Sequence, residues 1–131
     1  MFEHGQFYWN ELMTRDVAKA QAFYARTLGW TYESMPMPEG EYTLIKQGEN
    51  IVGGMMAITS DMPANMPAHW FSYVSVDDVD ARCAKVVAAG GHIERAPFDV
   101  EGVGRIAIVQ DASGAIIGWM TPAPMEKEGQ A

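Results

Sequence analysis

Residues 70–91, WFSYVSVDDVDARCAKVVAAGG, repeat the plan of residues 9–30, WNELMTRDVAKAQAFYARTLGW. Each stretch begins with an aromatic, strand-like run, continues through an Asp-Val pair into a helical pattern and reaches a glycine. A shift of 62 positions places Asp16 on Asp78 without a gap. An internal repeat of this length indicates a repeated structural unit, so the sequence predicts two copies of one module.

The apolar residues after each Asp-Val pair are spaced for an amphipathic helix that lies on a sheet. They comprise Val17, Ala20, Tyr24 and Leu28 in the first copy and Val79, Cys83, Val86 and Val87 in the second. A short carboxylate suits a helix N-cap, and glycine suits the left-handed position that ends a helix. The sequence therefore predicts helices that begin after Asp16 and Asp78 and end at Gly29 and Gly90.

Three β-like runs follow each predicted helix, so each module reads β-α-β-β-β. The predicted strands are Phe7–Met13, Trp30–Met35, Tyr42–Gln47 and Asn50–Ile58 in module one, and His69–Val76, His92–Arg95, Arg105–Gln110 and Ala115–Thr121 in module two. Two prolines in the segment 59–68 interrupt a sheet ladder, which marks a linker. We predict a single domain with module one at 6–58, the linker at 59–68, module two at 69–122 and a polar tail at 123–131.

Charge and composition narrow the classes of partner. The chain has 131 residues, the length of one domain, and its 17 Asp and Glu outnumber 9 Lys and Arg for a net charge of −8. That balance argues against nucleic acid and against an anionic membrane surface. No apolar run approaches the roughly 18 residues of a spanning helix, and the first ten residues lack a signal-peptide pattern. The lone Cys83 fits a reducing compartment, so we expect a cytoplasmic protein.

The two repeated stretches, together with residues 101–122, EGVGRIAIVQDASGAIIGWMTP, resemble the vicinal oxygen chelate superfamily. That group holds glyoxalase I, extradiol dioxygenases, and fosfomycin and bleomycin resistance proteins. The resemblance spans about residues 6–122 and implies an α+β fold. It further implies that two βαβββ modules form a curled eight-stranded mixed sheet around a cleft, and that the protein is a homodimer. The resemblance does not choose an activity, because this superfamily uses one scaffold for several chemistries.

The superfamily's metal enzymes place His, Gln or Glu ligands on equivalent strands of the two modules. In this chain the matching positions are Trp9, Phe71, Gly118 and either Gly53 or Gly54. Indole, phenyl and glycine offer no lone pair to a divalent cation. We therefore expect no metal site of the usual kind and no other cofactor.

Strand alternation predicts what lines the cleft instead. If Trp9 faces the cleft, then Glu11 and Met13 do as well; His69 and Tyr73 accompany Phe71, and Met120 accompanies Gly118. Such an aromatic and thioether-rich surface, with glycines leaving floor space, suits a flat or apolar small molecule. The alternative is that these residues simply fill the core of a closed sheet.

Three polar residues are candidates for chemistry. Glu11 or His69 could act as an acid or base, and Arg105, which follows two glycines, could meet a ligand anion. The structural alternatives are a rim carboxylate for Glu11, a histidine bonded to backbone beside the linker for His69, and an ion pair for Arg105. The partners considered for that ion pair are Asp99, Glu101 and Asp111.

Two functions of different class follow from these residues. The first is a metal-independent binding protein that holds a small apolar or planar molecule through Trp9, Phe71, Tyr73 and Met120. The second is a lyase, isomerase or dioxygenase related to glyoxalase I, in which a carboxylate or imidazole acts as base and a guanidinium steadies a developing anion.

Overall fold

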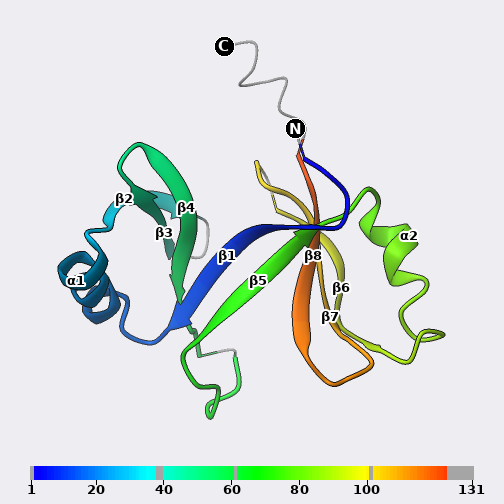
Figure 1. Ribbon diagram of the computed structural model, residues 1–131. Helices are drawn as coiled ribbons and strands as arrows, with labels where there is room; N and C mark the ends of the chain where they lie inside the picture. Colours follow the sequence, from blue (N-terminus) through cyan, green and yellow to red (C-terminus); the bar gives the residue numbers. More distant parts are fainter. Residues whose placement is uncertain (1, 38–39, 61, 101, 124–131) are drawn as a thin grey trace. The chain divides into compact units, whose positions relative to one another are not determined.

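The computed structural model describes residues 2–37, 40–60, 62–100 and 102–123. It divides into two compact units (Figure 1). The first unit comprises Trp9–Phe71, and the second joins the N-terminal residues up to Tyr8 to the segment from Ser72 onward. No helix among these described residues is long and apolar enough to cross a membrane.

Ten elements follow the predicted order of two βαβββ modules. They are β1 (Gln6–Thr14), α1 (Val17–Leu28), β2 (Thr31–Met37), β3 (Gly40–Gln47), β4 (Asn50–Ala57), β5 (His69–Ser75), α2 (Val79–Cys83), β6 (His92–Val100), β7 (Gly104–Gln110) and β8 (Ile116–Pro122). The strand order is β2-β3-β4-β1-β5-β8-β7-β6, with parallel and antiparallel pairs. The predicted α+β class with an eight-stranded mixed sheet is confirmed. The curl of that sheet around a shared cleft stays a prediction.

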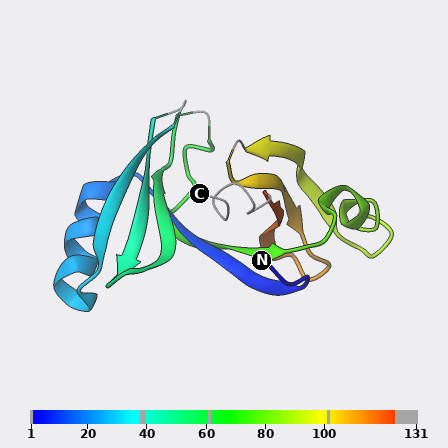
Figure 2. The ribbon, with the colours of Figure 1, turned by 90° about the horizontal axis from the view of Figure 1, so that it is seen from above.

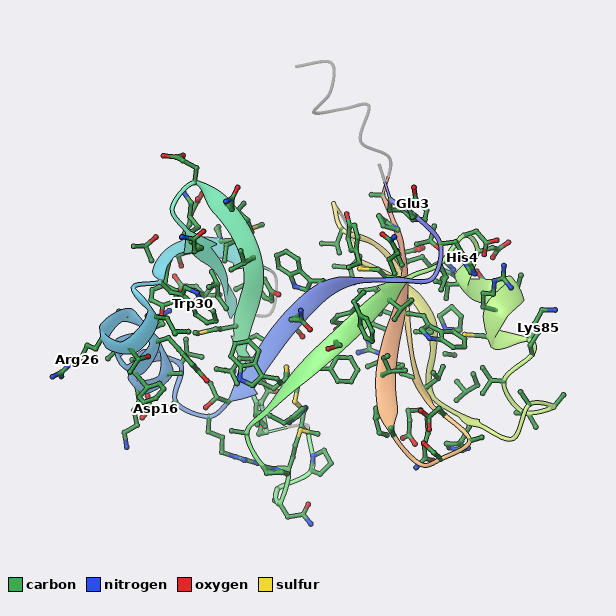
Figure 3. The ribbon with its side chains drawn as sticks, in the orientation of Figure 1. Glu3, His4, Asp16, Arg26, Trp30 and Lys85 are labelled. Carbon is green, nitrogen blue, oxygen red and sulfur yellow. The ribbon has the colours of Figure 1, made fainter. Side chains whose placement is uncertain are left out.

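The sheet of the first unit is covered by α1 on one face (Figure 2). Leu12, Ile45 and Met55 are buried on that face, and Val17 and Tyr24 of α1 pack against them. Arg26 of α1 points away from the sheet (Figure 3). The opposite face of this sheet, which we call the open face, carries the alternate residues of each strand.

The predicted signals at the ends of α1 are confirmed. Asp16 caps the helix, because its Oδ1 accepts the backbone N–H of Lys19 at 2.9 Å. Gly29 adopts a left-handed conformation with φ of 78°, and its N–H donates to the carbonyl of Ala25 at 3.2 Å. A short carboxylate and a left-handed glycine thus satisfy backbone groups that a helix leaves unpaired at its ends.

The second unit repeats this plan with a shorter helix. Val79 of α2 packs against Val76 of β5 and Ala107 of β7, all buried. Asp78 caps α2 as predicted, but the helix ends at Cys83, and turns cover residues 84–90. The prediction of a helix reaching Gly90 was therefore wrong in extent.

The early end of α2 has a local cause. The N–H groups of Lys85 and Val86 bond three residues back rather than four, which tightens the winding. Val86 stays buried at 6% exposure, whereas Val87 turns outward and is 72% exposed. Gly90 is left-handed, as predicted, but it ends this series of turns rather than an α-helix.

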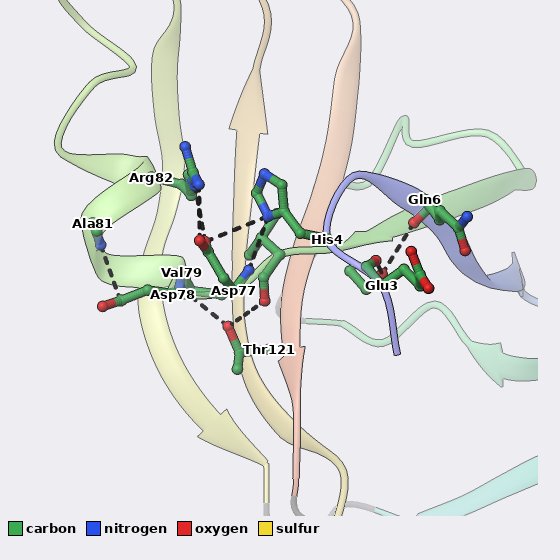
Figure 4. Close-up of polar contacts among 11 residues, drawn as sticks. Glu3, His4, Gln6, Asp77, Asp78, Val79, Ala81, Arg82 and Thr121 are labelled. Atoms are coloured by element: carbon green, nitrogen blue, oxygen red, sulfur yellow. Dashed lines mark hydrogen bonds and ion pairs between the residues drawn. The ribbon is translucent and has the colours of Figure 1, made fainter. Parts of the chain in front are cut away.

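The N-terminal residues are attached to the second unit by polar contacts (Figure 4). Nδ1 of His4 accepts the backbone N–H of Asp77 at 3.0 Å, and the Asp77 carboxylate accepts two hydrogen bonds from Arg82 at 2.9 and 2.8 Å. The hydroxyl of Ser75 lies against the carbonyls of Glu3 and Gln6. These bonds fix the chain just before β1 begins.

Candidate functional site

A chain of two hydrogen bonds crosses the open face of the first unit. The indole N–H of Trp9 donates to the hydroxyl oxygen of Tyr42 at 2.8 Å. The same hydroxyl donates to Oε1 of Glu11, also at 2.8 Å. Glu11 is buried at 7% exposure, and the other two side chains are partly buried. Three residues from two strands thus form one fixed polar cluster, which we call the Trp9–Tyr42–Glu11 cluster.

The chemistry of the three side chains decides which group donates each hydrogen bond in this cluster. An indole nitrogen can only donate, so the oxygen of Tyr42 must be the acceptor toward Trp9. The single proton of that hydroxyl then points to Glu11, whose Oε1 is an acceptor, the role of a carboxylate. Accepting one bond strengthens the hydroxyl as a donor for the next, so the two bonds support each other.

Gly54 makes this cluster possible. Tyr42 lies on β3 and Glu11 on β1, with β4 between them. Glu11 is paired with Gly54 in the parallel β1–β4 register, so the tyrosine side chain passes over that glycine. A Cβ atom on Gly54 would collide with the hydroxyl and ring of Tyr42. The prediction that a glycine here leaves floor space for a ligand was therefore wrong, because Tyr42 occupies that space.

The register also decides between the two glycines left open by the sequence. Gly54 pairs with Glu11 on β1, and Gly118 pairs with Tyr73 on β5. Since Glu11 and Tyr73 are related by the repeat, Gly54 is the counterpart of Gly118. Gly53 instead faces the α1 side, where a Cβ would lie 2.7 Å from a backbone carbonyl and close to an Ile45 methyl.

His69 is bonded to the linker. Its Nδ1 lies 2.8 Å from the carbonyl of Pro67, and a carbonyl can only accept, so Nδ1 carries the proton. The lone pair of the neutral ring therefore resides on Nε2. The Phe71 ring lies edge-on at 6.4 Å, two residues along the same strand. This is the backbone-bonded arrangement given above as the structural alternative to catalysis.

In the second unit, three predicted ligand-binding residues share one face. Tyr73 pairs with Gly118, and the neighbouring Ser75 pairs with Met120. Tyr73 and Met120 are buried at 9% and 4% exposure. Trp119, the residue between the two β8 positions, packs on the opposite face with the α2 core. Strand alternation thus brings these three residues together as the sequence predicts.

Arg105 lies on the other face of that sheet. It pairs with Thr121, which alternates with Met120, and its guanidinium bonds Asp80 of α2 at 2.7 Å and Asp99 at 3.1 Å. These two carboxylates raise the pKa of Arg105 above its ordinary value, chiefly through the bond to Asp80. Of the ion-pair partners considered from the sequence, Asp99 is present, and Asp80 was missed.

Two hollows in the described surface lie on the helix-covered faces. A groove of about 340 Å³ beside α1 is lined by Leu12, Thr14, Asp16, Lys19, Ala20, Phe23, Tyr24 and Ala68. A smaller hollow of about 140 Å³ lies in the second unit between the turns after α2, β7 and the β7–β8 turn. Neither hollow includes a predicted site residue.

The residues at the usual ligand positions do not fit a metal ion. Trp9 offers only an N–H donor, and the space beside Gly54 holds the Tyr42 hydroxyl. Across the described ranges, no three His, Cys, Asp or Glu side chains come together as a metal site would require. We derive no chemical step through a metal for this chain.

Comparison with known proteins identifies the family. The family model described as the Glyoxalase/Bleomycin resistance protein/Dioxygenase superfamily matches residues 6–118. This chain belongs to that superfamily. The resemblance inferred from the repeated βαβββ pattern is confirmed.

Named relatives cover this superfamily member almost completely. It is 42% identical over 125 residues to "Putative glyoxylase CFP32" of Mycobacterium tuberculosis, covering 95% of this chain and 47% of that protein. It is 32% identical over 137 residues to "Anthracycline biosynthesis protein DnrV" of Streptomyces peucetius, covering 95% and 50% respectively. The chain therefore spans about half the length of these curated relatives.

Solved structures of superfamily proteins share the fold. Methylmalonyl-CoA epimerase from Mycobacterium tuberculosis superposes with a TM-score of 0.67 at 18% identity, over 100% of this chain and 97% of the other. A homoprotocatechuate 2,3-dioxygenase variant from B. fuscum gives a TM-score of 0.62 at 20% identity, over 93% of this chain and 33% of the other. At these identities the likeness concerns the fold alone.

Proposed function

We propose that this protein holds a small apolar or planar molecule without a metal ion, at the open face of the first unit. The Trp9–Tyr42–Glu11 cluster carries this proposal, because Trp9 and Gly54 stand at positions where a metal enzyme of the superfamily needs lone-pair donors, and the Tyr42 hydroxyl over Gly54 is already hydrogen-bonded to Trp9 and Glu11. Trp9 supplies a flat ring held in place by its N–H, and Met13, further along the same face of β1, pairs with Met56 of β4. Rings and thioethers favour apolar, planar ligands.

Further residues extend this proposal. We also propose that Phe71 of the first unit contacts this molecule. Tyr73, Gly118 and Met120 then form an apolar ligand-binding face of the second unit. The name of the Streptomyces relative points to a planar polycyclic compound as one ligand class to test. We leave Arg105 out of this assignment, because its guanidinium is bonded to two carboxylates on the α2 side.

The experiment that tests this proposal separates binding from metal chemistry. Elemental mass spectrometry of freshly purified protein should show substoichiometric metal, and acridine, a neutral planar probe, should bind in the presence of EDTA. Trp9→Ala should weaken acridine binding at least tenfold while lowering the melting temperature much less than a core truncation. One tightly held Zn, Ni, Fe or Mn per chain, or acridine binding that Trp9→Ala leaves unchanged, would refute the proposal.

A second candidate is an enzyme of the superfamily that uses Glu11 or His69 as acid or base. Two observations favour it: Oε1 of Glu11 is a fixed acceptor, and the hydrogen bond of His69 to the Pro67 carbonyl uses Nδ1 rather than Nε2. Turnover of an α-ketoaldehyde or catechol substrate that falls to background in Glu11→Gln or His69→Ala would support this candidate. Turnover that persists in both variants would exclude these residues.

The remaining partner assignments are also proposals. The homodimer implied by the superfamily resemblance is tested by light scattering during size-exclusion chromatography, where a monomer mass would contradict it. A small molecule, rather than nucleic acid or a membrane surface, agrees with the net charge of −8.

A further inference from the structure

We infer that the molecule held at the Trp9–Tyr42–Glu11 cluster is a planar cation, a fused aromatic ring system that carries a positive charge. This inference rests on the proposed function and names the chemical class of its ligand. It is carried by the placement of a buried carboxylate, Glu11, in one hydrogen-bonded cluster with an aromatic ring, Trp9, on the same strand face.

The orientation of the cluster fixes Glu11 as its final hydrogen-bond acceptor. The Tyr42 hydroxyl accepts a hydrogen bond from Trp9 and donates one to Glu11, so both bonds are directed toward the carboxylate. The positive ends of these two dipoles hold Glu11 in place, and Gly54 keeps the path between the strands clear of a side chain. The carboxylate is thereby a fixed acceptor rather than a mobile rim group.

A carboxylate and an indole ring both attract a cationic ligand. A cation is attracted to the face of an aromatic ring, most strongly to tryptophan, and this attraction grows when the cation is desolvated. A carboxylate at 7% exposure acts in a medium of lower effective dielectric than water, so its attraction for a positive charge is stronger than at the surface. A planar cation gains from both groups, whereas a neutral ring of the same shape gains only from stacking.

The charges of the surrounding unit agree with this choice. The first unit carries seven acidic and four basic residues, and the whole chain has a net charge of −8. Its basic side chains are directed elsewhere: Lys19 and Arg26 belong to α1, Arg15 donates to the carbonyls of Pro63, Ala64 and Met66, and Lys46 lies 3.8 Å from Glu33. An approaching cation therefore meets an attractive field.

The test compares acridines that share one ring system and differ in charge. At pH 7.5, acridine is neutral, 9-aminoacridine and 10-methylacridinium are cations, and acridine-9-carboxylate is an anion. Each is titrated in EDTA and followed by its own fluorescence. We expect both cations to bind the wild-type protein roughly tenfold or more tightly than acridine, and the anion to bind most weakly. Equal affinities, or tighter binding of the anion, would overturn the inference.

Variants locate the source of the preference. Glu11→Gln keeps an oxygen acceptor for Tyr42 and removes the charge, so the ratio of cation affinity to acridine affinity should fall below about threefold. Glu41→Gln removes a carboxylate from the exposed surface of the same unit and should leave the preference intact. A preference that survives in Glu11→Gln, or that falls equally in Glu41→Gln, would show that net charge rather than Glu11 selects the ligand.

The outcomes also separate this inference from the proposed function. If acridine binds and Trp9→Ala weakens it but the cations gain nothing, only the inference about charge fails. If Trp9→Ala leaves the binding of every acridine unchanged, the proposed site itself fails. Should Glu11→Gln not fold, as judged by circular dichroism, the ranking of the four acridines on the wild-type protein still decides the inference.

Discussion

The hydroxyl of Tyr42 meets the carboxylate of Glu11 at 2.8 Å across a strand to which neither residue belongs. The intervening residue on that strand is Gly54, whose missing side chain leaves room for the phenol. A residue that lacks a side chain thus determines how two distant side chains meet. The following predictions test this arrangement and the electrostatics of the second unit.

Gly54→Ala should destabilise the protein by about 1–3 kcal/mol, the usual cost of forcing extra atoms into packed space. All three nearest atoms to the added Cβ belong to the Tyr42 side chain. The cost should therefore largely vanish when Gly54→Ala is made in a Tyr42→Ala background, as measured by urea unfolding in a double-mutant cycle.

Gly53→Ala is the matched control for this cycle. Its added Cβ would lie 2.7 Å from the backbone carbonyl of Asn10, which cannot rotate away. The cost of Gly53→Ala should be the same with and without the Tyr42 side chain. If Tyr42→Ala leaves the cost of Gly54→Ala unchanged, the phenol does not occupy the space over β4.

Tyr42→Phe should lower the free energy of unfolding by about 1–3 kcal/mol, because two partly or fully buried polar groups lose a partner when the hydroxyl is removed. Those groups are the N–H of Trp9 and Oε1 of Glu11. Denaturant unfolding measures the change, and Tyr8→Phe, at a site 41% exposed, should cost little by comparison. Equal costs for the two variants would contradict the hydrogen-bonded cluster.

Much of the fold is predictable from local sequence signals. Asp16 and Gly29 mark the ends of α1 because capping depends on residues within one turn of the helix end. The repeat of this pattern at Asp78 predicts a second module with the same strand order. These signals are short-range, so each can be recognised without knowing what packs against the element.

Features that depend on tertiary register are not visible in this way. Tyr42 has no distinguishing sequence context, and its partnership with Glu11 requires the parallel pairing of β1 with β4. Glycines within a strand pattern do indicate a close approach of other groups, and Gly53-Gly54 was such a signal. The sequence did not show whether a ligand or a side chain makes that approach.

The length of β6 shows the same limit. The sequence predicts His92–Arg95, whereas the strand continues to Val100 through Pro97. A proline is tolerated because β6 ends the strand order and pairs with β7 alone, and because the β6–β7 register shifts between Arg95 and Phe98, so Pro97 lies at an irregularity of the ladder. Edge position is a property of topology, and the local pattern of residues 92–95 does not show it.

Arg105→Gln should lower the melting temperature and leave acridine affinity unchanged. The guanidinium joins β7 to Asp80 on α2 and to Asp99 on β6, so the substitution removes both ion pairs. Because these pairs are exposed, the loss of stability should shrink in high salt. Acridine affinity that falls at least tenfold in this variant, at unchanged stability, would instead support the ligand-binding role considered from the sequence.

The ionised Asp77 side chain should stabilise the folded protein, and this stabilisation should be lost in acid. Its pKa is lowered from the ordinary 3.8 to about 2, chiefly by the hydrogen bonds from Arg82, with a further contribution from His4. Because the folded protein binds this proton less readily than the unfolded chain, the contribution is complete above about pH 4 and is lost as the pH falls toward 2. Urea unfolding at pH 5, 4, 3 and 2 measures the loss.

In Asp77→Asn, and equally in Arg82→Gln, the fall in unfolding free energy between pH 4 and pH 2 should be smaller than in the wild-type protein. Some fall should remain, because hydrogen bonds from Arg105 and Ser113 also lower the pKa values of Asp80 and Asp111. Glu94→Gln is the control, since Glu94 forms no ion pair within the described part of the chain. A wild-type acid response in Asp77→Asn would mean that the bonds from Arg82 do not hold this carboxylate in solution.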